Sequence, residues 1–169
     1  MLSTLTHFHG AIGWKRRLLV LLAVVMAASS PLQADPAGNQ AMAIQSGLDG
    51  EAARTAIAFQ QALRDGNAET ARRLLADDVH IYEGKGVERS ADEYAHHHMP
   101  GDMAFLKSLS FTPLEHRVRE AGDMAYSVAK TRLQGQYKGK DIDLISVETL
   151  VLARTGNGWK IVHIHWSHG

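Results

Sequence analysis

Histidines cluster in KIVHIHWSHG, the sequence that ends the chain. His163 and His165 alternate there with Val162, Ile164 and Trp166. Because side chains of a strand point alternately to opposite faces, both imidazoles would share one face and the three apolar side chains the other. Imidazole titrates near neutral pH, so a pair of imidazoles on the pocket side of a sheet can transfer protons. We therefore expect the last strand to carry the chemistry of this protein.

Glu148 is the acidic residue that the predicted C-terminal hairpin brings next to these imidazoles. The sequence TGNG is typical of a tight turn, which places Arg154 opposite Trp159. Counting inward from that pair puts Glu148 opposite His165, with their Cβ atoms about 4.5–5.5 Å apart. We predict that His165 and Glu148 are the catalytic pair and that His163 positions an oxygen of the ligand. The alternative is that the pair only fixes the strand register.

Two further sequences offer side chains for a ligand. Tyr82 and Glu83 alternate on a short predicted strand, so only one of them can face inward. The sequence HHH at 96–98 lies at a helix end, where consecutive residues spread around the axis and only one or two can join a site. The predicted ligand-binding residues are therefore His163, His165, Glu148, Tyr82 and His97.

Metal binding is an alternative use of the same residues. His163 and His165, with His97 or Glu148 as a third ligand, offer nitrogen and oxygen atoms to Zn²⁺ or Cu²⁺. A strand pair plus a distant helix residue is not a spacing signature of the HExxH kind, so we assign no metal ligands and predict no cofactor. The chain has no cysteine, which excludes disulfides and thiolate sites.

Composition limits the classes of partner. The chain has 169 residues, of which 45% are hydrophobic and 21% charged, as in an ordinary globular domain. Eighteen basic and eighteen acidic residues cancel, so the chain has no basic field to attract nucleic acid. The predicted partner is a small-molecule ligand, and no nucleic acid is expected.

The N-terminal segment has the layout of a secretory signal. A basic cluster precedes the apolar run 18–28, which is shorter than the roughly 20 residues that span a bilayer. We predict a signal peptide over 1–34, a flexible leader over 35–47 and a single domain over 48–169. The expected location is periplasmic or secreted, with no stable membrane insertion after the signal is removed.

Helical patterns come first in the predicted domain and strands dominate its second half. Apolar residues spaced by three and four predict a helix over 49–65, and Asn67 can cap a second helix. A strand at 79–83 follows, and SADE is a capping box that begins a third helix. The remaining predicted strands are 114–121, 124–137, 141–154 and 159–167. This order predicts an α+β fold with the helices on one face of a strongly bent, mostly antiparallel sheet.

Both faces of the C-terminal hairpin are apolar. One face can pack on the domain's own helices, and the other needs a separate cover. We therefore predict a homodimer through the outer sheet face. The residues expected on that face are Val151, Val162, Ile164 and Trp166.

The sequences FQQALRDGNAETARRLLADDVHIYEG and ETLVLARTGNGWKIVHIHWS carry a family resemblance. The chain resembles the nuclear transport factor 2-like superfamily, in its SnoaL-like group related to the calcium/calmodulin-dependent kinase II association domain. The resemblance implies a cone-shaped fold in which a curved sheet and three helices surround a pocket, usually in a dimer. It also implies that His163 and His165 face the pocket and that Glu148 lies on the neighbouring strand.

The resemblance covers isomerases, dehydratases, cyclases and members that only bind or assemble, so fold alone does not settle function. We predict an exported small-molecule-binding protein with a hydrophobic, His/Glu-lined pocket and acid–base activity of the isomerase, cyclase or dehydratase type. Whether it is an enzyme stays open. The alternatives are a non-catalytic binding or dimeric assembly module and a metal-binding protein that uses histidines.

Overall fold

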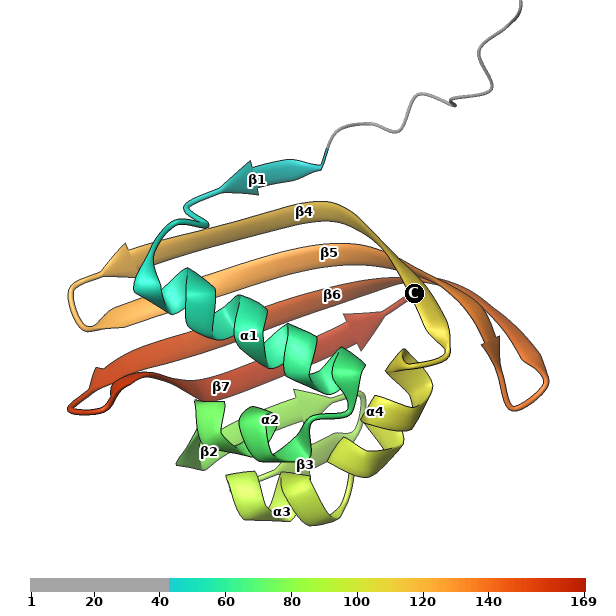
Figure 1. Ribbon diagram of the computed structural model, residues 1–169, viewed down its shortest axis with the longest axis horizontal. Coiled ribbons are helices and arrows are strands. Elements are labelled where there is room, and N and C mark those ends of the chain that lie inside the picture. Colours follow the sequence, from blue (N-terminus) through green and yellow to red (C-terminus); the bar gives the residue numbers. More distant parts are fainter. Residues whose placement is uncertain (1–42) are drawn as a thin grey trace, which may run out of the picture. The chain divides into compact units, whose positions relative to one another are not determined.

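The computed structural model describes residues 43–169 (Figure 1). The predicted signal peptide and most of the predicted leader lie outside these residues. No helix in the described part is long and apolar enough to cross a membrane. In chain order the elements are β1 (Ile44–Ser46), α1 (Glu51–Asp65), α2 (Ala68–Leu74), β2 (Leu75–Glu83), β3 (Gly86–Glu88), α3 (Ala91–His96), α4 (Met99–Leu106), β4 (Leu109–Ala121), β5 (Met124–Tyr137), β6 (Lys140–Thr155) and β7 (Gly158–His168).

One seven-stranded sheet organises the described residues, in the order β1-β4-β5-β6-β7-β2-β3. The long strands β4 to β7 form an antiparallel meander, and β2 joins β7 in parallel. Helix α1 lies across the inner face of the meander, and α2 to α4 gather at the end of the sheet that carries β2 and β3 (Figure 1). This arrangement confirms the predicted α+β, cone-like fold.

Helix α1 forms where the sequence predicts it. Ala52, Ala56 and Phe59 are fully buried, which confirms the apolar stripe. Gly66 ends the helix at φ 72°, a left-handed conformation that suits glycine. At the other end, Glu120 of β4 accepts a hydrogen bond from the Ala52 backbone N–H at 2.9 Å and ties the helix start to the sheet.

Three elements differ from the sequence-based expectation. Strand β2 begins at Leu75 rather than at residue 79 and pairs with the short strand β3, which was not predicted. Residues Ile44–Ser46, expected to belong to an irregular leader, instead pair in parallel with β4 as edge strand β1. Pro100 stands in the first turn of α4, where its missing N–H costs no helical hydrogen bond.

A β-bulge changes the register of the C-terminal hairpin. Near the turn the pairing is as predicted, down to Leu152 opposite Ile161. The next pair is Val151 with His163, so Val162 is an extra residue on β7 without a partner in β6. A bulge of this kind exchanges the faces of all later residues relative to a regular ladder.

The predicted contact between Glu148 and His165 is therefore wrong. Glu148 lies opposite Trp166, and His165 lies opposite Thr149. Ile164 is fully buried, and Trp166 stacks on Phe59 of α1 with ring centroids 6.5 Å apart. Ile164 and Trp166 were expected on the outer face and instead contribute to the inner face. The expectation was wrong because the sequence pattern does not reveal the extra residue in β7.

Candidate functional site

A pocket of about 290 Å³ lies between α1, α4 and the inner face of the sheet. Its apolar wall contains Leu63, Phe105, Leu106, Phe111, Leu133 and Trp166. The ionisable residues at its wall are Arg64, Glu83, Asp102, Glu115, His116, Glu148 and His168. An apolar cavity with a few converging polar groups is the usual form of a small-molecule site.

Glu148, on β6, is held from two sides in this pocket. The Trp166 indole N–H donates to Oε2 at 2.7 Å, and the Gln60 side-chain amide donates to Oε1 at 2.6 Å. Burial raises the pKa of Glu148, and the two hydrogen bonds and the charge of Arg64 oppose that rise only in part. Each carboxylate oxygen can still accept a further proton or hydrogen bond, so Glu148 is a fixed, poorly solvated base.

Asp102 forms a second polar group on the α4 side of the pocket. The hydroxyl of Tyr94, which is 1% exposed, donates to Asp102 Oδ2 at 2.8 Å. Burial raises the pKa of Asp102, while the Tyr94 hydrogen bond and His98 lower it. A carboxyl group with a raised pKa keeps its proton to higher pH and can donate it to a bound oxygen.

Glu83 at the end of β2 adds a third carboxyl group. Burial is the main cause that raises the pKa of Glu83, and the negative charge of Asp102 adds to it. Several carboxyl groups with raised pKa around one cavity are typical of functional sites. The pocket therefore has the groups needed to take and return protons.

The imidazoles at the pocket differ from the predicted ones. His116, on β4, contacts the Ser127 hydroxyl oxygen through Nε2 at 2.9 Å, and burial together with Arg64 lowers the pKa of His116. His168, at the end of β7, is exposed at the pocket wall. For His116, burial and the nearby charge of Arg64 both disfavour the charged form, so His116 is expected to be uncharged at neutral pH.

Of the predicted site residues, only Glu148 lines the pocket. His165 is exposed, and Tyr82 is 44% exposed and packs its ring against His163 at 5.7 Å on the outer face. His97 lies at the end of α3, with Nδ1 3.5 Å from Glu88 Oε2. The metal alternative needed His97 or Glu148 beside His163 and His165. Among the described residues the structure groups His97 with Glu88 and Glu93 instead, and Glu148 lies in the pocket opposite Trp166.

Sequence reasoning missed most of the partners of Glu148. Gln60 and Arg64 are ordinary polar residues of an amphipathic helix. Their four-residue spacing indicates only that they lie on the same face of that helix. Asp102 follows Pro100 in a short helical piece without a recognisable motif. Glu148 itself was detectable as a lone acid within the apolar sequence ISVETLVLA.

Proteins of known structure share this fold. A candidate ketosteroid isomerase from Shewanella frigidimarina NCIMB 400 is 49% identical, covers 73% of this chain and 99% of its own, and has a TM-score of 0.71. A candidate dehydratase of the NTF2-like family from Streptomyces avermitilis is 25% identical over 68% of this chain and 90% of its own, with a TM-score of 0.57.

A candidate calcium/calmodulin-dependent protein kinase II association domain from Xanthomonas campestris shares the fold alone. It is 22% identical over 75% of this chain and 94% of its own, with a TM-score of 0.57. Among curated proteins none matches the chain significantly. The SnoaL-like domain family matches residues 53–169, from the first turn of α1 to the C-terminus. With that match and the similarity to the Shewanella protein, the chain belongs to the SnoaL-like domain family of NTF2-like proteins.

Proposed function

We propose that the pocket binds a small, largely apolar carbonyl compound and that Glu148 transfers a proton to or from the carbon next to the carbonyl group. The observation that carries the proposal is the partly buried Glu148 carboxylate, fixed by Gln60 and Trp166 against an apolar wall. Burial raises its pKa, which brings a carboxylate closer to the basicity that proton abstraction requires.

Asp102 supplies the second part of the proposed reaction. In its protonated form it would donate a hydrogen bond to the carbonyl oxygen, which becomes negative when the carbon loses its proton. Tyr94 holds Asp102 in place from outside the pocket. Returning the proton from Glu148 to a different carbon completes an isomerisation, in which no atom is gained or lost.

The name of the Shewanella protein supports this choice of reaction over others. At 49% identity it is described as a candidate ketosteroid isomerase, and proton transfer next to a carbonyl is the chemistry that such a name denotes. The His165–Glu148 pair that the sequence predicted has no part in the proposal, because His165 lies on the outer face.

The test is hydrogen exchange. The full chain is incubated in D₂O with a panel of apolar ketones that includes a β,γ-unsaturated 3-ketosteroid, and deuterium uptake next to the carbonyl is followed by mass spectrometry. We expect uptake above background with wild type, and a loss of about 10²- to 10⁴-fold in Glu148→Gln. Asp102→Asn should also slow exchange.

Asp143→Asn is the matched control, because this carboxylate lies on the same strand as Glu148 but is exposed and paired with Arg132 at 2.6 Å. Asp143→Asn should take up deuterium at the same rate as wild type. Equal rates in wild type and Glu148→Gln would contradict the proposal. Binding of ketones without exchange, seen as a change in tryptophan fluorescence, would favour a binding module.

A dimer through the outer sheet face is the second part of the proposal. Four large apolar side chains of that face are well exposed: Tyr82 at 44%, Met124 at 47%, Tyr126 at 44% and Val147 at 42%. Exposed apolar residues gathered on one face mark an interaction surface. The Xanthomonas neighbour is an association domain by name, which fits a second copy of this chain as the partner.

Export also stays a proposal, and it rests on the signal-like layout of residues 1–34. Fractionation of expressing cells, followed by N-terminal sequencing of the mature protein, tests it. Protein that keeps Met1 and stays in the cytoplasm would contradict it.

A further inference from the structure

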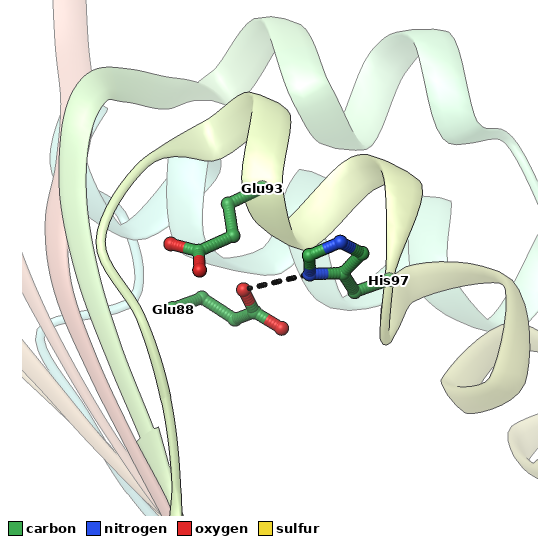
Figure 2. Close-up of side chains that lie close together, drawn as sticks. All are labelled: Glu88, Glu93 and His97. Carbon is green, nitrogen blue, oxygen red and sulfur yellow. Dashed lines mark ion pairs between the residues drawn. The ribbon is translucent and has the colours of Figure 1, made fainter.

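A second cluster of ionisable groups lies outside the pocket, where β3 passes into α3. Glu88 is the last residue of β3, and only Arg89 and Ser90 separate it from the helix. Glu93 and His97 lie four residues apart and so share one helix face. Figure 2 shows both carboxylates and the His97 ring turned toward a common space.

Glu88 is an unusual residue for this position because its carboxylate is almost completely buried. The residue is 4% exposed, and Oε2 has no hydrogen-bond donor among the described residues. His97 Nδ1 lies 3.5 Å from Oε2, which is too long for an ordinary N–H···O hydrogen bond. A buried charged oxygen without a partner is costly, so its position calls for a ligand that is not a protein group.

The spacing of the cluster fits a small divalent ion. Each of Glu88, Glu93 and His97 offers a ligand atom, and these atoms lie within 4.8 Å of one another. At metal–ligand distances of about 2.0–2.2 Å, two ligands of a tetrahedral Zn²⁺ stand about 3.4 Å apart. The 3.5 Å between His97 Nδ1 and Glu88 Oε2 matches that edge of the tetrahedron.

The groups around the cluster would hold its ligands in place. His98 Nδ1 contacts the other oxygen of Glu88, and the Arg89 backbone N–H donates to Glu93 Oε2 at 2.6 Å. Hydrogen bonds of this kind orient ligating carboxylates. One imidazole and two carboxylates form a mixed nitrogen and oxygen set, which suits Zn²⁺ better than Mg²⁺ or Ca²⁺.

We propose that Glu88, Glu93 and His97 form a binding site for a divalent transition-metal ion of the Zn²⁺ type, with water as the fourth ligand. The ion would fasten the end of β3 to the last turn of α3. It would lie apart from the Glu148 pocket, and the ligand set differs from the one that the sequence suggested. The proposal therefore stands independently of the proposed reaction.

The experiment uses the untagged full chain, treated with a chelator that is then removed, and titrated with Zn²⁺ by calorimetry. We expect one equivalent to bind at this site and to raise the midpoint of thermal unfolding. Co²⁺ in place of Zn²⁺ should give the visible absorption bands of a four-coordinate ion.

His97→Ala and Glu88→Gln should each weaken Zn²⁺ binding by at least about 10-fold. His96→Ala is the matched control, since His96 is the adjacent exposed histidine and its Nδ1 contacts the Asp92 backbone oxygen instead. It should bind like wild type. His97 is largely exposed, so His97→Ala decides the question even if Glu88→Gln fails to fold.

Absence of Zn²⁺ binding to wild type would overturn the proposal and leave Glu88 as a histidine-paired acid. So would binding that His97→Ala does not change, because the ion would then lie elsewhere, for instance at His7 and His9 of the N-terminal segment.

Discussion

The two faces of β7 differ in what they do with similar residues. On the inner face, Ile164 is fully buried and Trp166 donates a hydrogen bond to Glu148 inside the pocket. On the outer face, His163 packs on Tyr82 and His165 is exposed. His163 and His165, which the sequence suggested as the reactive residues, thus lie on the outer face. Trp166, which the sequence suggested as a packing residue, donates the hydrogen bond to Glu148. A residue's face decides its role more than its type does.

The largest expected difference between the two faces is in stability. Ile164→Ala removes a fully buried side chain that lies opposite buried Leu150, so it should lower the free energy of unfolding by about 2–5 kcal/mol. His165→Ala, one residue further, should change it by no more than about 0.5 kcal/mol. Urea unfolding measures both. Similar losses in the two variants would show that His165 is buried and that the bulge is absent.

The two inner-face tryptophans of β7 sharpen the comparison within one face. Trp166→Phe leaves Glu148 Oε2 without its indole donor, and a hydrogen bond to a charged group contributes about 1.5–3 kcal/mol. Trp159→Phe loses no such bond, because the buried Trp159 Nε1 has no partner among the described residues. At neutral pH, Trp166→Phe should therefore lower the free energy of unfolding more than Trp159→Phe does. The reverse order would contradict the assignment of Trp166 as a partner of Glu148.

Charge on the outer face tests whether that face is an interface. Tyr126→Lys should weaken dimer formation by at least about tenfold, or about 1.4 kcal/mol, because an ammonium group would be buried without a partner. Ile57→Lys is the control, since Ile57 is 39% exposed but lies on α1. Sedimentation at several protein concentrations measures both. A dimer that Tyr126→Lys leaves intact would place the interface elsewhere.

The smallest expected effect is on the pH dependence of stability, where a carboxyl group of the pocket and one on the outer sheet face should give slopes of opposite sign. The pKa of Asp102, in the pocket, is raised above the ordinary 3.8, so the folded state binds more protons and its stability falls as pH rises through the folded pKa. The pKa of the outer-face Asp143 is lowered, first by its hydrogen bond to Arg132, so its contribution is present above pH 3.8 and is lost as pH falls.

Asp102→Asn should therefore remove a decrease in stability as pH rises above 3.8. Asp143→Asn should remove an increase in stability as pH rises toward 3.8. Thermal unfolding between pH 3 and pH 7, compared with wild type, measures both slopes. Equal signs would show that Asp102 is solvated like a surface residue.

Local patterns allowed much of the fold to be predicted. The apolar stripe of α1, its glycine end, the Asn67 cap of α2 and the Ser90 cap of α3 all follow from short-range rules that hold without tertiary contacts. The capping hydrogen bonds to Asn67 and Ser90, each 3.0 Å, confirm the two caps. The site was harder, because its residues come from α1, α4 and at least five strands of the sheet.

Local patterns were enough to predict the order of the main helices and long strands, the helix caps, the TGNG turn and one acid in an apolar strand, since each depends on neighbouring residues. The contacts of Glu148 with Trp166 and Gln60, rather than with His165, depend instead on how distant elements pack. The reason is physical: a strand's side chains alternate with a period of two, so one extra residue, Val162, moves everything beyond it to the opposite face. Burying Ile164 and Trp166 against α1 favours the bulged register over the regular one.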